Sequence, residues 1–144
     1  MKRTLLTATV LMLLAGAGFY LAQNDSTKTP VHKNINVEVY KTASYVSPAY
    51  KNTTATLEVT VIRVNGNAKD TVWQHAFQPT ELKDFPEADK PIIQKIDIPN
   101  VNDGKESLEV YYKVTYNSKG SILNQWNYAV IGQGEQTGKL YIQI

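Results

Sequence analysis

Oxygen-bearing side chains crowd one short stretch, residues 97–106, and raise the question of a calcium site. The stretch reads DIPNVNDGKE and gathers aspartate, asparagine and glutamate around Gly104. An EF-hand loop needs ligands at alternating positions, glycine at the sixth and a bidentate glutamate at the twelfth. Counted from Asn100, glycine comes one position early and Tyr111 stands twelfth. The spacing therefore predicts a turn, in which Asn and Asp bond to the backbone and Gly104 supplies a positive φ.

Other residues with catalytic or metal-binding chemistry are few. The chain has two histidines and no cysteine, so a zinc site would need both histidines and at least one carboxylate. His75 lies between Trp73 and Phe77 on one face of an alternating segment, and we interpret it as a partly buried histidine rather than a general base. The GQGEQTG stretch at 132–138 lacks the Lys-Ser/Thr ending of a phosphate loop. We therefore predict no catalytic, cofactor-binding or metal site.

One enzymatic alternative rests on carboxylates. Asp97 with Glu106 or Glu109 is the nearest pair of acids. Glycosidases place two carboxyl groups roughly 5–10 Å apart across a cleft, which a small domain with short loops rarely provides. We expect a non-enzymatic protein, and a small hydrolase using loop carboxylates is the alternative.

Aromatic residues are the best functional lead. The chain holds nine tyrosines and two tryptophans, and rings on an exposed sheet face can stack on sugars or anchor a protein partner. Tyr111 alternates away from the apolar face of residues 108–116, while Tyr45 and Tyr50 fall in the Pro-containing loop SYVSPAYKN. We predict that these three tyrosines bind a partner, and that Trp126 and Tyr112 belong to the core.

The N-terminal segment has the pattern of a secretory signal. Lys2 and Arg3 precede an uncharged run from residue 4 to residue 24, as in a signal peptide. We assign residues 1–22 to it, with cleavage after Ala17 or Ala22. An uncleaved anchor is the alternative, because the run is near the ~20 residues that span a bilayer. The protein is then exported to the periplasm, the cell surface or the medium, and contacts a membrane only through an uncleaved segment.

Removing the signal changes the charge balance. The whole chain has 15 basic and 13 acidic residues, and residues 1–22 contain two of the basic ones and no acidic one, leaving 13 of each. Nucleic-acid binding needs clustered Lys and Arg against phosphates, so we expect no nucleic-acid partner. The remaining residues suffice for one domain with a hydrophobic core.

Hydrophobic periodicity predicts an all-β fold. Residues 23–34 are polar and aperiodic and predict a flexible tether. Apolar residues then alternate with period two through 35–144, which predicts an antiparallel β-sandwich of about seven strands. Asn65-Gly66 is a hairpin signal, a register break is expected near Ile62, and PTELKDF predicts one helical turn capped by Thr80. The predicted inward faces are Ile35/Val37/Val39, Leu57/Val59/Val61, Ile92/Ile96/Ile98, Leu108/Val110/Tyr112/Val114/Tyr116, Ile122/Trp126/Tyr128/Val130 and Leu140/Ile142/Ile144.

The last hairpin has a predicted register. A three-residue loop over 118–120 would place Tyr112 opposite Trp126 and would pair apolar residues with apolar residues on one face. A one-residue slip would move every side chain to the other face.

The stretch IDIPNVNDGKESLEVYYKVTYNSKG, residues 96–120, resembles immunoglobulin-like modules such as fibronectin type III and transthyretin-like bacterial domains. The resemblance covers roughly residues 92–120. It departs at Ser107, where a fibronectin-type module usually has Tyr, and no Trp occurs in residues 55–65. It implies an immunoglobulin-like sandwich with an adhesive or accessory role, which means a protein or glycan partner at the cell envelope.

Overall fold

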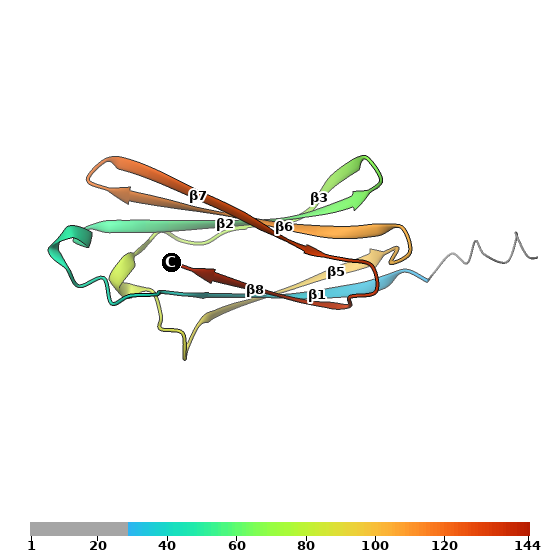
Figure 1. The fold of residues 1–144 in the computed structure, drawn as a ribbon, viewed down its shortest axis with the longest axis horizontal. Helices are drawn as coiled ribbons and strands as arrows, with labels where there is room; N and C mark the ends of the chain where they lie inside the picture. The colour runs from blue at the N-terminus through green and yellow to red at the C-terminus, as the bar shows by residue number, and fades with distance from the viewer. Residues whose placement is uncertain (1–28) are drawn as a thin grey trace, which may run out of the picture.

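The computed structural model describes residues 29–144, so the expected signal peptide and residues 23–28 of the expected tether lie outside it. Strands dominate this part of the chain (Figure 1). They are β1 (Val31–Tyr40), β2 (Thr53–Asn65), β3 (Ala68–Ala76), β4 (Thr80–Glu81), β5 (Ile92–Val101), β6 (Glu106–Ser118), β7 (Ser121–Ile131) and β8 (Thr137–Gln143).

The strands form two sheets that lie one above the other in Figure 1. Sheet A has the order β5-β1-β8, and sheet B has the order β3-β2-β6-β7 with the short β4 beside β2. The all-β prediction is confirmed, with eight strands in place of about seven. The antiparallel prediction is wrong for one pairing, because β8 runs parallel to β1.

Period-two alternation correctly predicts most of the core. The register shift expected near Ile62 falls between Val61 and Ile62. The prediction is wrong for Ile92, which is exposed at the start of β5. The strand that breaks the pattern most is β7, where of the eleven residues only Ile131 is buried. The buried strand residues that match the prediction are Ile35, Val37, Val39, Leu57, Val59, Val61, Ile96, Ile98, Leu108, Val110, Val114 and Ile142.

The tether prediction is wrong for residues 31–34, which already belong to β1. Lys33 occupies an inward position and is fully buried. Its Nζ lies 2.7 Å from Asp103 Oδ1 and donates to the carbonyl oxygens of Gly132 and Glu135 at 2.6 and 2.8 Å. A buried ammonium is tolerated only when it is paired and hydrogen-bonded in this way. Because the partners of Lys33 lie far away in the sequence, the sequence around Lys33 does not indicate that this residue is buried or that β1 has begun.

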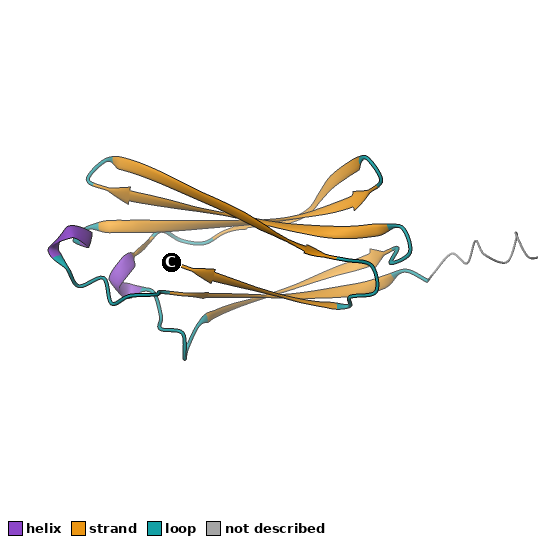
Figure 2. Ribbon diagram, in the orientation of Figure 1, coloured by secondary structure: helices purple, strands orange, loops and turns teal. Residues whose placement is uncertain are grey.

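The helical content of residues 29–144 is two single 3-10 turns, η1 (Pro48–Tyr50) and η2 (Leu82–Asp84), at one end of the sandwich (Figure 2). The predicted single turn is η2, which buries Leu82, but Thr80 does not cap it because Thr80 lies in β4. Among these described residues, no helix has the length and apolar character needed to cross a membrane.

Candidate functional site

The turn between β6 and β7 sets which side chains face the solvent. Ser118 pairs with Ser121, so the loop has two residues, Lys119 and Gly120, and the predicted three-residue loop is wrong. Both loop residues have positive φ, 50° and 89°, as in the type I′ hairpin turn that suits twisted strands. Asn117 supports this turn, because its Oδ1 accepts a hydrogen bond from the Gly120 amide at 3.2 Å.

The shorter loop shifts the register by one residue and exchanges the two faces of β7. Tyr112 lies opposite Asn127, and Trp126 lies opposite Lys113 on the outside of sheet B. The prediction that Trp126 is a core residue is therefore wrong, since 71% of its surface is exposed. The outward residues of β7 are Ile122, Asn124, Trp126, Tyr128 and Val130.

We call the surface formed by Tyr111, Ile122, Trp126, Tyr128 and Val130 the aromatic face. The rings of Tyr111 and Tyr128 stack across the two strands, with centroids 5.5 Å apart and planes inclined by 21°. Trp126 stands two residues before Tyr128 on the same side of β7. The structure thus joins Tyr111, which the sequence predicted as a binding residue, to two rings that the sequence prediction had assigned to the core.

Charged neighbours hold Tyr111 in position. Its hydroxyl donates to Glu109 Oε2 at 2.8 Å, and Lys69 Nζ reaches the same oxygen at 2.7 Å. The hydrogen bond from Lys69, and then that from Tyr111, lowers the pKa of Glu109. The bond to Glu109 raises the pKa of Tyr111 in turn. The phenol therefore stays a neutral donor at neutral pH, with its ring fixed against Tyr128.

The β7 backbone also has N–H and C=O groups without a partner strand on one side, because among the described strands β7 pairs with β6 alone. The two-residue turn makes Ser118 and Ser121 a hydrogen-bonded pair, and bonded and non-bonded pairs alternate along an antiparallel ladder. Odd-numbered residues of β7 therefore bond to β6, while even-numbered residues direct N–H and C=O to the free edge. Tyr128 agrees with this assignment, since its amide donates to Asn127 Oδ1 at 2.8 Å.

The inner face of β7 is covered only near its end. Gly138 of β8 lies against Ile131, where an added Cβ would come within 2.8 Å of Ile131 Cγ1, so a close approach of the two strands needs glycine there. Toward the β6–β7 turn no such cover exists among the described residues, and Leu123 is 67% exposed. The first half of β7 is thus accessible from both sides.

An open groove lies beneath this half of β7. Its volume is about 540 Å³, and its described lining residues are uncharged. Tyr45 and Tyr50 meet there edge to face at 5.1 Å, and Tyr45 donates to the Ile144 carbonyl oxygen at 2.6 Å. Burial, followed by the neighbouring Tyr45 and Tyr112, raises the pKa of Tyr116. The lining residues are Tyr45, Ala49, Tyr50, Thr53, Leu82, Tyr116, Ser118, Ser121, Ile122, Leu123 and Gln125.

The three tyrosines predicted to bind a partner therefore flank β7 on its two sides. Tyr45 and Tyr50 lie in the groove, and Tyr111 lies on the aromatic face. Sequence reasoning missed Trp126, Tyr128 and Leu123 as exposed residues. The signal that could have found them is the absence of any charged residue in residues 121–131 together with apolar residues at both odd and even positions.

Only the end of the oxygen-rich stretch, residues 102–105, forms the β5–β6 turn, and the prediction of a turn is wrong for residues 97–101, which belong to β5. Asn102 Oδ1 accepts from the Gly104 amide, and Glu106 Oε2 accepts from the Asn102 amide at 2.8 Å. The positive φ lies at Asn100, 58°, rather than at Gly104, so that part of the prediction is wrong. Asp103 faces the Lys33 ammonium and the Gly134 amide, so its carboxylate stabilises the fold.

The remaining chemical candidates have ordinary neighbours. His75 is exposed rather than partly buried, and its ring contacts Trp73 and Phe77 at centroid distances of 5.9 and 4.8 Å. His32 pairs with Asp97 at 3.1 Å. Within residues 29–144, no three His, Cys, Asp or Glu side chains gather as a metal site would require.

No protein-family model, curated protein or solved structure matches this chain. The exposed surfaces around β7 are therefore the basis for assigning a function.

Proposed function

We propose that this chain is an exported, non-enzymatic module with an immunoglobulin-like β-sandwich that binds a partner protein through β7. The observation that carries the proposal is an eleven-residue edge strand with no charged residue and an apolar outer face. Export is supported by Lys2 and Arg3 ahead of the uncharged run. The carboxylates of the hydrolase alternative have basic or backbone partners instead of facing a cleft.

Strand addition is the mode of binding that this geometry favours. An extended polypeptide beside a free edge gains main-chain hydrogen bonds, and its alternate side chains reach the two faces of the sheet. Beside β7, one set would extend the aromatic face and the other would enter the groove next to Leu123. Tyr111 and Tyr128 already cover one ring face of each other, so their stack leaves less ring surface for a sugar.

A glycan is the second candidate, and the exposure of Trp126 favours it. An indole ring that is 71% exposed, near Lys113 and Asn124, could stack on a sugar while polar neighbours bond to its hydroxyls. The two candidates differ in whether the backbone edge takes part.

Proline at position 124 separates them. The Asn124 amide points to the free edge, so Asn124→Pro removes one outward donor and leaves the ladder to β6 intact, and Asn124→Ala is the matched control. Random twelve-residue peptides displayed on phage are selected against the full chain and measured by fluorescence polarisation. We expect selected peptides to alternate apolar residues, and to lose roughly tenfold or more in affinity for Asn124→Pro but not for Asn124→Ala.

Chito- and cello-oligosaccharides are tested on the same variants. Glycan binding would survive Asn124→Pro and disappear in Trp126→Ala, and that result would replace the protein-binding proposal. Peptides that bind Asn124→Pro as tightly as the unmodified chain would also overturn strand addition.

A further inference from the structure

The free edge of β7 has none of the features that normally prevent strand association. Natural edge strands carry charged side chains on the strand itself, proline, bulges or very short length. Over Ser121–Ile131 there is no charged residue and no proline, and the pairing with β6 continues without a register shift. Such a strand can pair with another uncharged strand without charge repulsion, and β7 of a second copy of the chain is such a strand.

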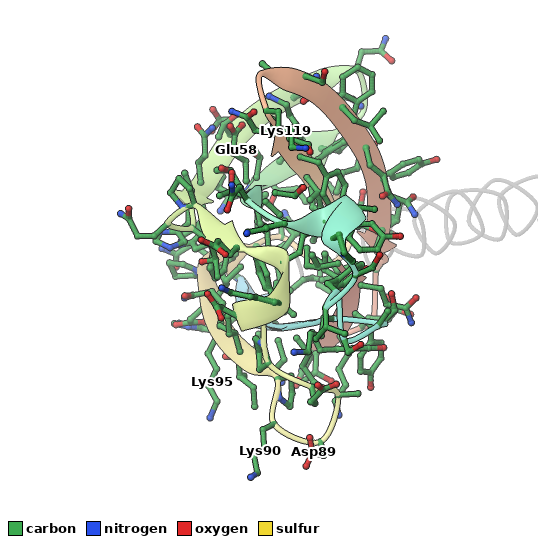
Figure 3. All side chains as sticks on the ribbon, turned by 90° about the vertical axis from the view of Figure 1, so that its left-hand side faces the viewer. Glu58, Asp89, Lys90, Lys95 and Lys119 are labelled. Atoms are coloured by element: carbon green, nitrogen blue, oxygen red, sulfur yellow. The ribbon has the colours of Figure 1, made fainter. Side chains whose placement is uncertain are left out.

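Charges just beyond the two ends of β7 have opposite sign. Lys119 lies in the turn before the strand, Glu135 follows it in the loop to β8, and both are exposed. Figure 3 looks at the turn end and shows Lys119 in the same layer as Glu58, with Lys90 and Lys95 in the opposite layer. An antiparallel pair of copies brings Lys119 toward Glu135 of the second copy, whereas a parallel pair would bring like charges together.

We propose that the partner strand of β7 is β7 of a second copy of this chain, paired antiparallel about a two-fold axis at Asn127. The inference rests on the proposed function and names the protein that occupies the site. A two-fold axis at Asn127 places Trp126 opposite Tyr128 of the second copy, and it brings the turn with Lys119 toward the loop that carries Glu135 of the second copy. Asn127 then lies opposite its own counterpart, as an isologous interface requires.

This register extends the stacking already present on the aromatic face. Tyr111 stacks on one side of Tyr128, and Trp126 of the second copy takes the other side. Lys113 of the second copy ends this row, because it lies opposite Trp126 on β6. The two-fold axis repeats the arrangement, so the joined sheets carry two neighbouring rows of three rings each. Even-numbered residues of β7 pair with even-numbered residues of the second copy, which are the positions that direct backbone groups to the free edge.

The inner faces are also compatible. Leu123, exposed above the groove, lies opposite Ile131 of the second copy, and Gln125 lies opposite Ala129 of the second copy. These pairs place uncharged side chains beside the uncharged groove. The dimer therefore buries apolar surface on both sides of the new strand pair without burying an unpaired charge.

Proline substitution tests whether the edge mediates self-association. Analytical ultracentrifugation of the full chain over a dilution series should show a reversible dimer. We expect Asn124→Pro to weaken dimerisation by roughly tenfold or more and Asn124→Ala to change it by less than about threefold. Association through residues 1–28 would be equal in both variants, so a dimer that persists in Asn124→Pro overturns the proposal.

Introduced cysteines test the register, since the chain has none of its own. Asn127→Cys should form a disulfide-linked dimer under mild oxidation, because a non-hydrogen-bonded antiparallel pair has Cα atoms about 4.5 Å apart. Asn124→Cys alone should not, because its counterpart lies six residues along the partner strand, roughly 20 Å away. Mixing Asn124→Cys with Val130→Cys should restore cross-linking.

The other outcomes of these experiments distinguish a wrong register from a wrong partner. If Asn124→Cys cross-links alone as efficiently as Asn127→Cys, the proposed register is overturned. A monomer at every concentration, with no Asn127→Cys dimer, overturns the second copy as partner. In that case, selected peptides that still distinguish Asn124→Pro from Asn124→Ala would leave the proposed function standing, and loss of both would remove it.

Discussion

The two edge strands of sheet B differ in whether they carry features that prevent pairing with another chain. The β3 edge carries Lys69 and Asp70, and its pairing with β2 shifts register between Val61 and Ile62. Charges and bulges are the usual protection of an edge against association. The β7 edge is longer, regular and uncharged. The same sheet therefore contains one edge adapted to remain single and one edge that retains the capacity to pair.

The two tryptophans of the chain show the same contrast. Trp73 lies on β3 and packs against the core, whereas Trp126 lies on β7 and projects to solvent. Their sequence surroundings are similar, since each stands in an alternating apolar segment. The cover available from the opposite sheet, and not hydrophobicity alone, therefore decides whether a strand residue is buried.

The largest expected difference between the edges is in stability. Trp73→Ala removes a partly buried ring, so we expect it to cost about 2–3 kcal/mol of unfolding free energy, less than a fully buried aromatic. Trp126→Ala should change the unfolding free energy by no more than about 0.5 kcal/mol. Urea denaturation of both variants measures this. A larger cost for Trp126→Ala than for Trp73→Ala would mean that β7 faces the core after all.

Much of the fold follows from the sequence because period-two alternation reports burial wherever a second sheet covers the strand. β1, β2 and β6 are covered, and Val37, Val59 and Val110 are buried as their alternation predicts. The rule fails for β7, where apolar residues occupy both faces and matching them to β6 favours the wrong register. Lys119 at positive φ is an uncommon turn residue, so turn chemistry gave no correction.

The candidate site was predictable only in part, for a related reason. Tyr45, Tyr50 and Tyr111 are recognisable as aromatic residues outside an alternating core face. The stacking of Tyr111 on Tyr128 depends on the two-residue turn that sets the register of β6 and β7, and the shared groove of Tyr45, Tyr50 and Leu123 depends on packing between segments far apart in the sequence. Local sequence patterns encode neither the register nor that packing.

A charged residue on β7, like those that protect the β3 edge, should weaken the self-association of the chain. Val130→Lys places a charge on the outer face of the free edge, and we expect roughly tenfold or more weaker self-association with little change in stability. Gln74→Lys, on the exposed side of β3, is the matched control and should have no effect. Sedimentation measures both variants. Equal weakening by both lysines would indicate a general charge effect and not an effect of the edge.

Amide exchange should distinguish the two sides of β7. At low protein concentration, we expect the amides of Asn124 and Trp126, which point to the free edge, to exchange roughly tenfold or more faster than the amides of Gln125 and Asn127, which bond to β6. Tyr128 should be intermediate, because its amide donates to Asn127. Exchange followed by NMR tests this, and raising the protein concentration should slow the outward amides selectively. Uniform rates along β7 would contradict the two-residue turn.

The smallest expected effect is the pH dependence of the Lys69–Glu109–Tyr111 cluster that links the two edges. Folding lowers the pKa of Glu109, mainly through Lys69. A lowered folded-state pKa contributes stability above the unfolded value, about 4.3, and that stability is lost as pH falls through the folded-state pKa. Thermal melts from neutral to acid pH should show less acid sensitivity for Glu109→Gln than for the unmodified chain. Identical acid profiles would show that the cluster is not formed in solution.

The central position of β1 in sheet A has a consequence for the order in which the protein folds. β1 is made early and lies between β5 and β8, and the parallel partner in residues 137–143 is made about a hundred residues later. Contacts of such long sequence separation close slowly. During synthesis, the β2–β3 and β6–β7 hairpins and the β2–β6 pairing that joins them can all form before β8 is made, while β1 waits for its second neighbour. A ribosome-bound chain that stops before β8 would therefore carry a half-paired β1, and this nascent state is the one that most needs shielding from other chains.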